Sequence, residues 1–353
     1  MIKVALVYNL KKAKSKDVPC DYFSEFDSRK TLEAIAQALS LGGHKVFLAQ
    51  AEACLLDWLR ANPVDIVFNI AEGFSGTGRE SQVPAILDFL GIPYTGSGVL
   101  ALALSMDKAM AKQIFIHNGI PTPKFQLFKK GPGPFVESKR GLAPFLSFPL
   151  IVKPNCEGSA KGIHASSVVR DYPRLYEEIA AIMRLYRQDV LVEEFIDGVE
   201  VTVGILGNQP HNILPPLEID FSNCEKRGES FYSWEVKEYQ GINPLYPDPQ
   251  FYCPARLSKA QEEKVKKAAL KAHQVLGCLD VSRVDIRLSS DSIPYVLEVN
   301  PLSGLDPEES NLTRMAEAAG MSYPDLINGI LESALERYQL VSSSKNEALT
   351  QER

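Results

Sequence analysis

The sequence predicts an α/β domain with a doubly wound parallel sheet at its N-terminus, followed by an α+β region. Up to about residue 97, short apolar runs alternate with segments of helical spacing, and the connections between them are short. This alternation is typical of β-α units and therefore of a parallel sheet. In the last third of the chain, expected strands follow one another in pairs and long helices separate the pairs, which is typical of an α+β fold.

Residues 1–97 are expected to form the α/β domain. The apolar run Lys3–Tyr8 suits the middle of a parallel sheet, and helical spacing follows over Ser28–Leu41 until Gly42 and Gly43 end the helix. The expected elements after it are strand Lys45–Ala49, helix Ala51–Arg60, strand Val64–Asn69, helix Arg79–Leu90 and the extended segment Ile92–Gly96.

Residues 98–189 are expected to form a second domain. Asp107 can cap a helix that runs to Asn118. The stretch Gly131–Pro149 is rich in glycine and proline, which predicts a surface loop. The other expected elements are the strands Leu150–Val152 and Ile163–Val169, which form a hairpin around the glycine-bearing tip Lys153–Gly162, and the helix Tyr172–Tyr186.

Residues 190–340 are expected to form a third domain of α+β type. The expected strands are Val190–Phe195, Val199–Leu206, Val281–Leu288 and Ile293–Val299. The expected helices are Ser258–Leu276, Asn311–Ala319 and Tyr323–Tyr338. The polar tail 341–353 is expected to be disordered.

The composition excludes several classes of protein. The formal net charge is −6, which argues against nucleic acid as a partner. No apolar run approaches the roughly 18 residues that span a bilayer, and the N-terminus lacks the features of a signal peptide. We therefore expect a cytosolic (cytoplasmic) protein with no membrane partner. The six cysteines show no C-x-x-C spacing, which favours reduced thiols over disulfides or zinc.

Two acidic strands near the end of the chain carry the strongest signal for chemistry. Alternate side chains of a strand face the same side, so Asp285 shares a face with Arg283 and Arg287. Glu298 and Asn300 share a face of the next strand in the same way. Mg²⁺ accepts such oxygen ligands together with substrate phosphates. The pattern predicts a magnesium site; the alternative is a solvated sheet face on which the acids pair with the two arginines.

Two lysines indicate a phosphate site. Lys153 ends an apolar strand and precedes a glycine-bearing tip, whose backbone N–H groups can form an anion nest. Lys108 opens a helix, where the helix dipole disfavours a cation unless an anion is near; the alternative is a solvated lysine. The chain has no G-x-x-x-x-G-K-[ST] motif, and no G-x-G-x-x-G follows its first strand. Both absences argue against P-loop kinases and dinucleotide dehydrogenases.

The segment Val192–Glu200 joins two expected strands and carries acids on both sides of an aromatic residue. An adenine ring requires an apolar or aromatic sandwich with a carboxylate near its amino group, and a ribose requires a carboxylate for its hydroxyls. Glu193, Phe195 and Glu200 could supply these groups. The alternative is a turn in which the acids are solvated.

In this order, the motifs resemble the ATP-grasp superfamily and, within it, the D-alanine–D-alanine ligase family, from about residue 64 to residue 335. The matching stretches are Ile92–Gly98, Ser105–Lys108, Ile151–Pro154, Glu157–Ser159, Phe251–Ala255, Arg283–Asp285 and Leu297–Asn300. The resemblance implies an ATP-grasp fold, in which two α+β subdomains clamp ATP. It also implies a ligase that phosphorylates a carboxylate to an acyl phosphate, which an amine attacks to give an amide, ADP and phosphate.

The resemblance implies a nucleotide site built from particular residues of this chain. Lys108 and Lys153 would bind the ATP phosphates, and Ser159 would lie in the loop that closes over them. Lys237 would cover the γ-phosphate from the mobile segment 231–239. The groups implied for adenine are Glu193, Phe195 and Phe231, and the group implied for ribose is Glu200.

The resemblance also implies the catalytic and metal-binding groups. Arg283, with the backbone around Gly304, would stabilise the oxyanion of the tetrahedral intermediate. Asp285, Glu298 and Asn300 would bind two Mg²⁺ ions, which Mn²⁺ could replace. The partners would be small-molecule carboxylate and amine substrates, and the family is often homodimeric.

The chain departs from the family where the amino-acid substrates bind. The family's glutamate for the ammonium of the first D-alanine has no counterpart after Tyr8, and Glu25 and Glu72 are the candidates to replace it. Glu72 stands where the family usually has histidine. Other departures are Glu238, in place of the tyrosine after the loop lysine, and Leu305–Ser310, which shifts a serine expected to hold the second carboxylate and adds Glu308 and Glu309. The added acids favour a substrate with extra amino groups or hydroxyls, unless Glu308 and Glu309 lie on the surface.

We therefore expect an ADP-forming carboxylate–amine ligase that acts on substrates other than plain D-alanine, for instance of the mycosporine type. The alternatives are a D-alanine–D-alanine ligase of peptidoglycan synthesis, a catalytically inactive nucleotide-binding regulator and a Rossmann-type dehydrogenase. The presence of Arg283 and of all the metal-ligand candidates argues against an inactive protein. The missing glycine fingerprint argues against the dehydrogenase.

Overall fold

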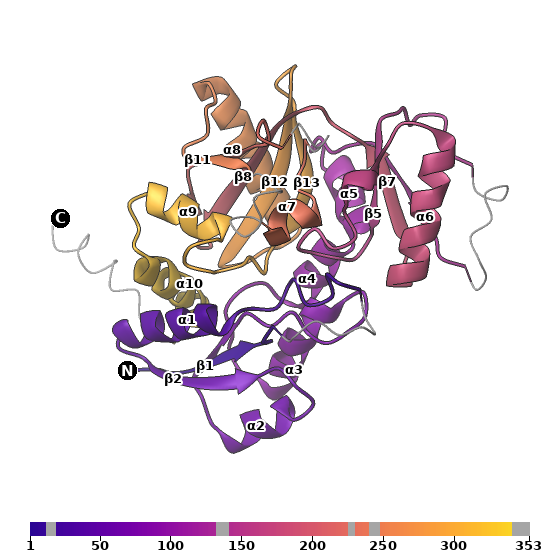
Figure 1. The fold of residues 1–353 in the computed structure, drawn as a ribbon. Helices are drawn as coiled ribbons and strands as arrows, with labels where there is room; N and C mark the ends of the chain where they lie inside the picture. The colour runs from indigo at the N-terminus through magenta and orange to yellow at the C-terminus, as the bar shows by residue number, and fades with distance from the viewer. Residues whose placement is uncertain (12–18, 132–140, 225–229, 240–247, 341–353) are drawn as a thin grey trace.

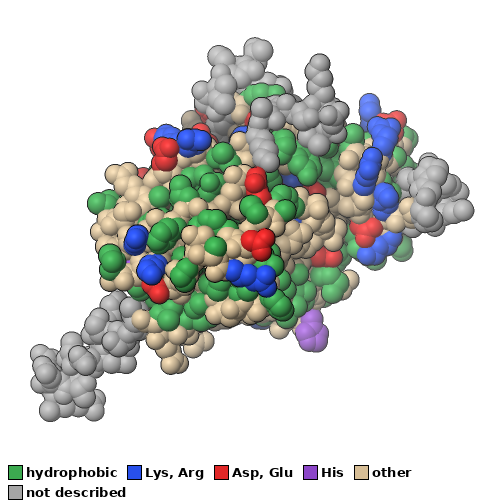
Figure 2. Space-filling model, turned by 90° about the horizontal axis from the view of Figure 1, so that it is seen from below, with side chains coloured by type: hydrophobic (Ala, Val, Ile, Leu, Met, Phe, Trp, Pro, Cys, Tyr) green, Lys and Arg blue, Asp and Glu red, His purple; other side chains and the backbone are tan. Residues whose placement is uncertain are grey.

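The computed structural model describes residues 1–11, 19–131, 141–224, 230–239 and 248–340. The described chain folds around a three-stranded, a four-stranded and a six-stranded sheet, and helices lie against each of them (Figure 1). Within these stretches, no helix is long and apolar enough to cross a membrane. On the face seen from below, acidic and basic side chains are interspersed, and Lys and Arg side chains gather towards one edge (Figure 2).

The first sheet is parallel, and helices cover both of its faces. Its strands lie in the order β2 (Lys45–Gln50), β1 (Lys3–Tyr8) and β3 (Ile66–Asn69). Val4 and Leu6 of β1 belong to the core that α1 (Arg29–Leu41) and α10 (Tyr323–Arg337) cover. Ala5 and Val7 point to the core of α2 (Leu55–Ala61) and α3 (Gln82–Leu90). Burial on both faces explains the unbroken apolar run of β1, and the predicted doubly wound parallel sheet is confirmed.

The four-stranded sheet is antiparallel and carries one long helix. Its order is β4 (Phe125–Phe128), β7 (Val190–Glu194), β5 (Leu150–Pro154) and β6 (Val168–Val169). Helix α6 (Tyr172–Tyr186) packs on it through Leu175, Ile179 and Ile182. The helix begins where the Asp171 side chain accepts a hydrogen bond from the Arg174 N–H, as expected for an N-cap.

The six-stranded sheet has one apolar face, and its other face is partly polar. Its main path is β11 (Gln250–Tyr252), β10 (Leu217–Asp220), β8 (Gly198–Leu206), β12 (Val281–Ser289) and β13 (Pro294–Asn300), and β9 (Asn212–Ile213) pairs with β8. Val284, Ile286 and Leu288 of β12 pack in one core with α8 (Lys259–Val275) and α5 (Lys108–His117). The side chains between them therefore face the other way, because the strand alternates. On that second face, Leu206, Ile219 and Val281 belong to the core that α1 and α10 cover. Helix α9 (Asn311–Ala318) precedes α10, which is the last helix of the described chain.

Several predicted elements differ in extent from the structure. The strand expected over Ile163–Val169 is wrong for its first part, because the chain turns and forms the short helix η3 (Ala165–Ser167) before β6. The helix expected from Ala51 begins only at Leu55, and a 3₁₀ turn, η1 (Arg79–Ser81), precedes α3. Residues 132–140 of the predicted loop and the predicted disordered tail 341–353 lie outside the described residues.

The elements missed by the sequence analysis are mostly short. They are α4 (Val99–Met106), β4, β9, β10, β11 and α7 (Trp234–Tyr239). Strands of two to four residues contain too few alternations to be told from loops. Helix α4 is apolar almost throughout, so it lacks the polar face that marks an amphipathic helix.

Candidate active site

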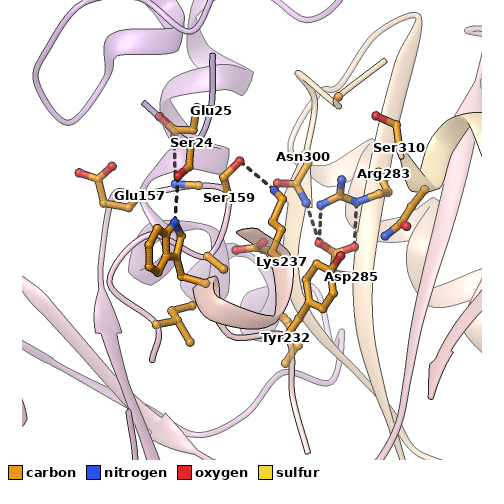
Figure 3. Close-up of a pocket in the computed structure, with 18 of the residues that line it drawn as sticks. Ser24, Glu25, Glu157, Ser159, Tyr232, Lys237, Arg283, Asp285, Asn300 and Ser310 are labelled. Carbon is orange, nitrogen blue, oxygen red and sulfur yellow. Dashed lines mark hydrogen bonds and ion pairs between the residues drawn. The ribbon is translucent and has the colours of Figure 1, made fainter. Parts of the chain in front are cut away.

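A cavity of about 590 Å³ is lined from all three sheet units. It receives side chains from the segment after β1, from β5 and β7, and from β12 and β13. Figure 3 shows the groups from the segment after β1 and from β12 and β13. Every residue that the sequence analysis assigned to the site lines this cavity: Lys108, Lys153, Ser159, Glu193, Phe195, Glu200, Phe231, Lys237, Arg283, Asp285, Glu298 and Asn300. The fold therefore brings the predicted set together.

The polar face of β12 and β13 forms one wall. Asp285 is paired with Glu298 in the strand register, and Arg283 is paired with Asn300. The Arg283 guanidinium donates to Asp285 from Nε to Oδ1 at 3.0 Å and from Nη2 to Oδ2 at 2.8 Å. Asn300 Nδ2 donates to Asp285 Oδ2 at 2.9 Å (Figure 3), and Thr202 Oγ1 donates to Oδ1 at 2.7 Å. These hydrogen bonds fix the orientation of the Asp285 side chain.

The same wall has the donor set expected of a magnesium site. The Asn300 amide nitrogen is engaged with Asp285, which leaves its oxygen as the available acceptor. Burial alone would raise the pKa of Glu298, but Lys108, at 3.0 Å, and Lys153 lower it to about 2. Glu298 is therefore ionised at neutral pH. Across the described stretches no group of three or more His, Cys, Asp or Glu side chains is arranged as a metal site. An amide and substrate oxygens would have to complete the shell, which suits Mg²⁺.

Lys153 and Glu193 form a buried ion pair next to this wall. Lys153 Nζ lies 2.5 Å from Glu193 Oε1, and a second lysine, Lys112, lies 2.8 Å from Glu193 Oε2. Lys112 follows Lys108 by one turn of α5, and the Asp107 side chain caps that helix by accepting from the Met110 N–H. The sequence analysis missed Lys112. The signal that could have found it is the spacing of four residues between Lys108 and Lys112, which places both lysines on one side of the helix.

The segment 231–239 closes over the cavity. Lys237 Nζ donates to Ser159 Oγ at 3.0 Å (Figure 3), and Trp234 Nε1 donates to Ser24 Oγ at 2.9 Å. The ring of His164 lies 2.7 Å from Glu235 Oε1. Burial lowers the pKa of Lys237 to about 8, and the nearby Arg283 adds to this shift. Helix α7 within the segment thus joins the segment after β1 to the tip after β5.

Aromatic and acidic side chains line the end of the cavity next to β7 and β8. The rings of Phe195 and Phe231 lie 5.9 Å apart in an edge-on arrangement, and the Arg287 guanidinium lies 5.0 Å from the centre of the Phe195 ring. Glu200 Oε2 is 3.7 Å from Arg287 Nη1, and burial raises the pKa of Glu200 to about 7. An apolar ring surface beside a carboxylate is what a base and its ribose require.

A buried group of four charges lies at the opposite side of the cavity. Glu25 Oε1 is 2.5 Å from Arg79 Nη2, and Glu25 Oε2 is 2.8 Å from Lys161 Nζ. Glu157 pairs with the same two cations, and the Gly158 N–H donates to Glu25 Oε1 at 2.8 Å. Burial alone would raise the pKa of Glu25, but Arg79 and Lys161 outweigh it and lower the pKa to about 2. Sequence analysis found Glu25 and Glu157 and missed both cations.

Two further carboxyl groups of this side lack such partners. In the described chain, the Glu72 side chain has no hydrogen bond or ion pair, and burial raises its pKa well above the usual range, with Glu80 and Glu25 adding to the shift. Burial, together with Glu25, raises the pKa of Glu80 to about 7. A cation bound between them would favour the ionised form of both carboxyl groups, which no ion pair of the described chain holds.

The departures near α9 line the other rim of the cavity. Burial and the neighbouring Asp306 raise the pKa of Asp27 to about 7. The Asp306 N–H donates to Ser310 Oγ at 2.8 Å, which places the shifted serine at the cavity. Glu308 is 70% exposed and pairs with Lys30, so its charge is largely solvated.

The chain is similar to known proteins over most of its length. The family described as D-ala D-ala ligase C-terminus matches residues 114–332. The chain is 35% identical to the uncharacterized protein y4sG of Sinorhizobium fredii, over 87% of this chain and 88% of that protein. It is 32% identical to a D-alanine–D-alanine ligase of Desulforudis audaxviator, over 88% of this chain and 94% of the relative.

Solved structures show the same fold. Two structures of D-alanine–D-alanine ligase from Bacillus anthracis, one complexed with ATP, superpose with TM-scores of 0.71 and 0.72. Each alignment covers 96% of this chain and 99% of the other, at 23% and 25% identity. The likeness supports the ATP-grasp fold expected from the sequence.

Proposed function

The chain belongs to the D-alanine–D-alanine ligase family of ATP-grasp enzymes, and from this premise we propose that it is an ADP-forming carboxylate–amine ligase. One observation supports the proposal most strongly. Three lysines, a fixed arginine and an oxygen-rich wall converge on one cavity that also has an aromatic end. Each of these parts suits one portion of ATP or of an acyl transfer reaction.

In the proposed first step, Lys108, Lys153 and Lys237 hold the phosphates while a substrate carboxylate oxygen attacks the γ-phosphorus. The bond to the β-phosphate oxygen breaks, and ADP and an acyl phosphate form. Asp285, Glu298 and Asn300 would hold Mg²⁺, which when bound neutralises the charge of the phosphates. Phe195 and Phe231 would hold the adenine, with Glu193 at its amino group, and Glu200 the ribose.

In the proposed second step, the substrate amine attacks the carbonyl carbon of the acyl phosphate. Arg283 stabilises the oxyanion of the tetrahedral intermediate, because Asp285 fixes its guanidinium at the wall of the cavity. The C–O bond to phosphate then breaks, leaving an amide and inorganic phosphate. One proton is released overall, since the amine enters as an ammonium.

We infer that the substrates differ from plain D-alanine. Glu25 is one candidate for binding the ammonium of the first substrate. Its oxygens are already occupied by Arg79, Lys161 and the Gly158 N–H. Glu72 lines the same cavity and has no ion pair in the described chain, although Arg79 acts on its charge from a distance. We assign the ammonium to Glu72, and the additional carboxyl group of Glu80 favours a substrate with more than one amino group or hydroxyl.

A substrate screen tests this function. The purified protein would receive MgATP with D- and L-amino acids, dipeptides and polyamines, singly and in pairs, and ADP, AMP and phosphate would be measured. ADP and phosphate in equal amounts with an amide product are expected. AMP and pyrophosphate would contradict the acyl phosphate route.

The second candidate is a D-alanine–D-alanine ligase. The 32% identity to the Desulforudis audaxviator enzyme over most of both chains favours it. In the same screen, rapid formation of the dipeptide from D-alanine alone would select this candidate over the first.

A further inference from the structure

Glu193 lies between two lysines that differ in their access to the cavity. Lys153 and Glu193 line the cavity, whereas Lys112 does not and is completely buried, at 0% exposure. The two carboxylate oxygens of Glu193 are divided between them, with Oε1 near Lys153 and Oε2 near Lys112. Lys112 therefore cannot reach a bound ligand, but it acts directly on a residue that can.

Lys112 is held in place from a second side. Its Nζ donates to Thr122 Oγ1 at 2.9 Å, and Thr122 Oγ1 donates to the carbonyl oxygen of Val296 in β13 at 2.8 Å. The lysine thus stands between the four-stranded sheet, which carries Glu193, and the six-stranded sheet, which carries Glu298. Its position is fixed by packing and hydrogen bonds. Burial lowers the pKa of Lys112 to about 8, so the group next to Glu193 is mostly cationic at pH 7.

The charge balance suggests what this arrangement does. With Lys112 present, the three side chains carry a net charge of +1, which leaves Lys153 attractive to an anion. Without Lys112, Glu193 and Lys153 would form a neutral pair, and a phosphate would compete with Glu193 for the same ammonium group. A buried carboxylate that shares or loses its only cation takes up a proton.

We propose that Lys112 is a positioning residue, the buried counter-ion of Glu193, which makes Lys153 available to a nucleotide phosphate. This inference rests on the proposed function in one respect, since it assumes that Lys153 binds ATP. The other charged groups near the triad are Glu298 and Glu200, both of which lie within the influence of Lys153. Neither Glu298 nor Glu200 is replaced in any variant below, and the charges of both change only where the nucleotide itself acts on them.

The test compares nucleotide binding and turnover in Lys112→Met, Lys112→Arg and the unaltered protein. Binding of Mg²⁺ with the non-hydrolysable β,γ-imido analogue of ATP would be measured by calorimetry at pH 7 in two buffers of different ionisation enthalpy. We expect Lys112→Met to bind at least ~10-fold more weakly, a difference of about 1.4 kcal/mol. We also expect it to take up close to one more proton on binding than the unaltered protein. In turnover, the KM for MgATP should rise more than kcat falls, and Lys112→Arg should restore both binding and proton balance.

Two controls separate this role from a structural one. Lys124→Met removes an exposed lysine that pairs with Glu194, the next glutamate of the same strand, and should change neither affinity nor proton uptake. The double variant Lys112→Met/Glu193→Gln has no carboxylate at position 193 left to protonate, so the extra proton uptake should disappear. Partial unfolding of the Lys112→Met protein would not make the extra uptake depend on Glu193 in this way.

The outcomes distinguish the inference from the function on which it rests. If the unaltered protein binds the analogue and Lys112→Met binds it with the same affinity and the same proton balance, the inference is refuted and the ligase proposal stands. If the unaltered protein does not bind the analogue, both are refuted.

Discussion

Lys237 and Ser159 meet over the cavity, where Lys237 Nζ donates a hydrogen bond of 3.0 Å to Ser159 Oγ. The two residues are separated by 78 positions and belong to segments that leave different sheets. Their contact puts an ammonium group and a hydroxyl at the point where the segment 231–239 faces the tip after β5 (Figure 3). Both groups are therefore placed to act on the same portion of a bound nucleotide.

The first prediction concerns the charge of Lys237. Replacement of Lys237 by Met should lower kcat by roughly 100-fold, because it removes a donor aimed at the charge that develops on the transferred phosphoryl group. Ser159→Ala should have a smaller effect, since it removes only a neutral hydroxyl. The rate of ADP formation at saturating MgATP measures both. Lys266→Met, on the outer surface of α8, serves as the control and should retain the unaltered rate.

The second prediction is a pH dependence. Burial, aided by Arg283, lowers the pKa of Lys237 to about 8, so this lysine is cationic below that pH and loses its charge as the pH rises through it. The kcat/KM for MgATP, which reports groups of the free enzyme, should therefore fall above about pH 8. Lys237→Arg should move this decline to higher pH, because arginine keeps its proton. An unchanged alkaline limb in Lys237→Arg would show that another group controls it.

The sequence was sufficient to place the residues whose signals are local. Strict alternation in β12 and β13 put Arg283, Asp285, Glu298 and Asn300 on one face, and the register in the structure agrees. The position of Lys153, at the end of an apolar strand, is visible in the same way. These signals depend only on neighbours within a few residues, so they can be recognised without knowledge of the fold.

The cations that pair with Glu25 could not be found in this manner. Arg79 and Lys161 lie 54 and 136 positions from Glu25, and nothing in their local sequence distinguishes them from solvated residues. Only the packing of the first sheet against the tip after β5 brings them together. Long-range pairing of this kind decides which acid of the cavity is left to bind a substrate, so substrate choice is the part that local patterns reveal least.

The third prediction concerns the metal wall. Glu298→Gln should reduce turnover by well over tenfold at saturating Mg²⁺, because it removes an ionised oxygen ligand while keeping the shape of the side chain. It also deprives the buried Lys108 of its carboxylate partner. Phosphate release would be measured, with the thermal midpoint confirming that the variant is folded. If the variant kept more than about a third of the rate, a loss under ~1 kcal/mol, Glu298 would not be a metal ligand.

The fourth prediction is a stability effect at Glu25. Its pKa falls from 4.5 to about 2, since Arg79 and Lys161 outweigh the cost of burial. This stabilisation is fully present above pH 4.5 and is lost as the pH falls through about 2. Glu25→Gln should therefore lower the free energy of unfolding by about 3 kcal/mol at pH 7. The difference from the unaltered protein should shrink progressively below pH 4.5.

Urea unfolding at pH 7 and at successively lower pH measures this difference. Glu177→Gln, which breaks the exposed pair with Arg174, should change stability far less at every pH because solvent screens it. A deficit in Glu25→Gln that stayed constant with pH would mean that the lost packing, not the charge, is responsible.

The last prediction is that plain D-alanine is a poor substrate and that Glu72 selects the better one. The oxygens of Glu25 are already taken. D-alanine has a single ammonium, which Glu72 would bind, so the buried carboxyl group of Glu80 would be left without a cation. A shortfall of ~3 kcal/mol would lower kcat/KM for D-alanine by roughly two orders of magnitude relative to the best amine found in the screen. Glu72→Gln should lower kcat/KM for that better amine far more than it changes the KM for MgATP, since Glu72 is assigned to the ammonium and acts on Lys237 only through its charge. Dipeptide formation from D-alanine near one turnover per second at about millimolar concentration, an ordinary enzyme rate, would instead show that a single ammonium is sufficient and would establish the cell-wall reaction.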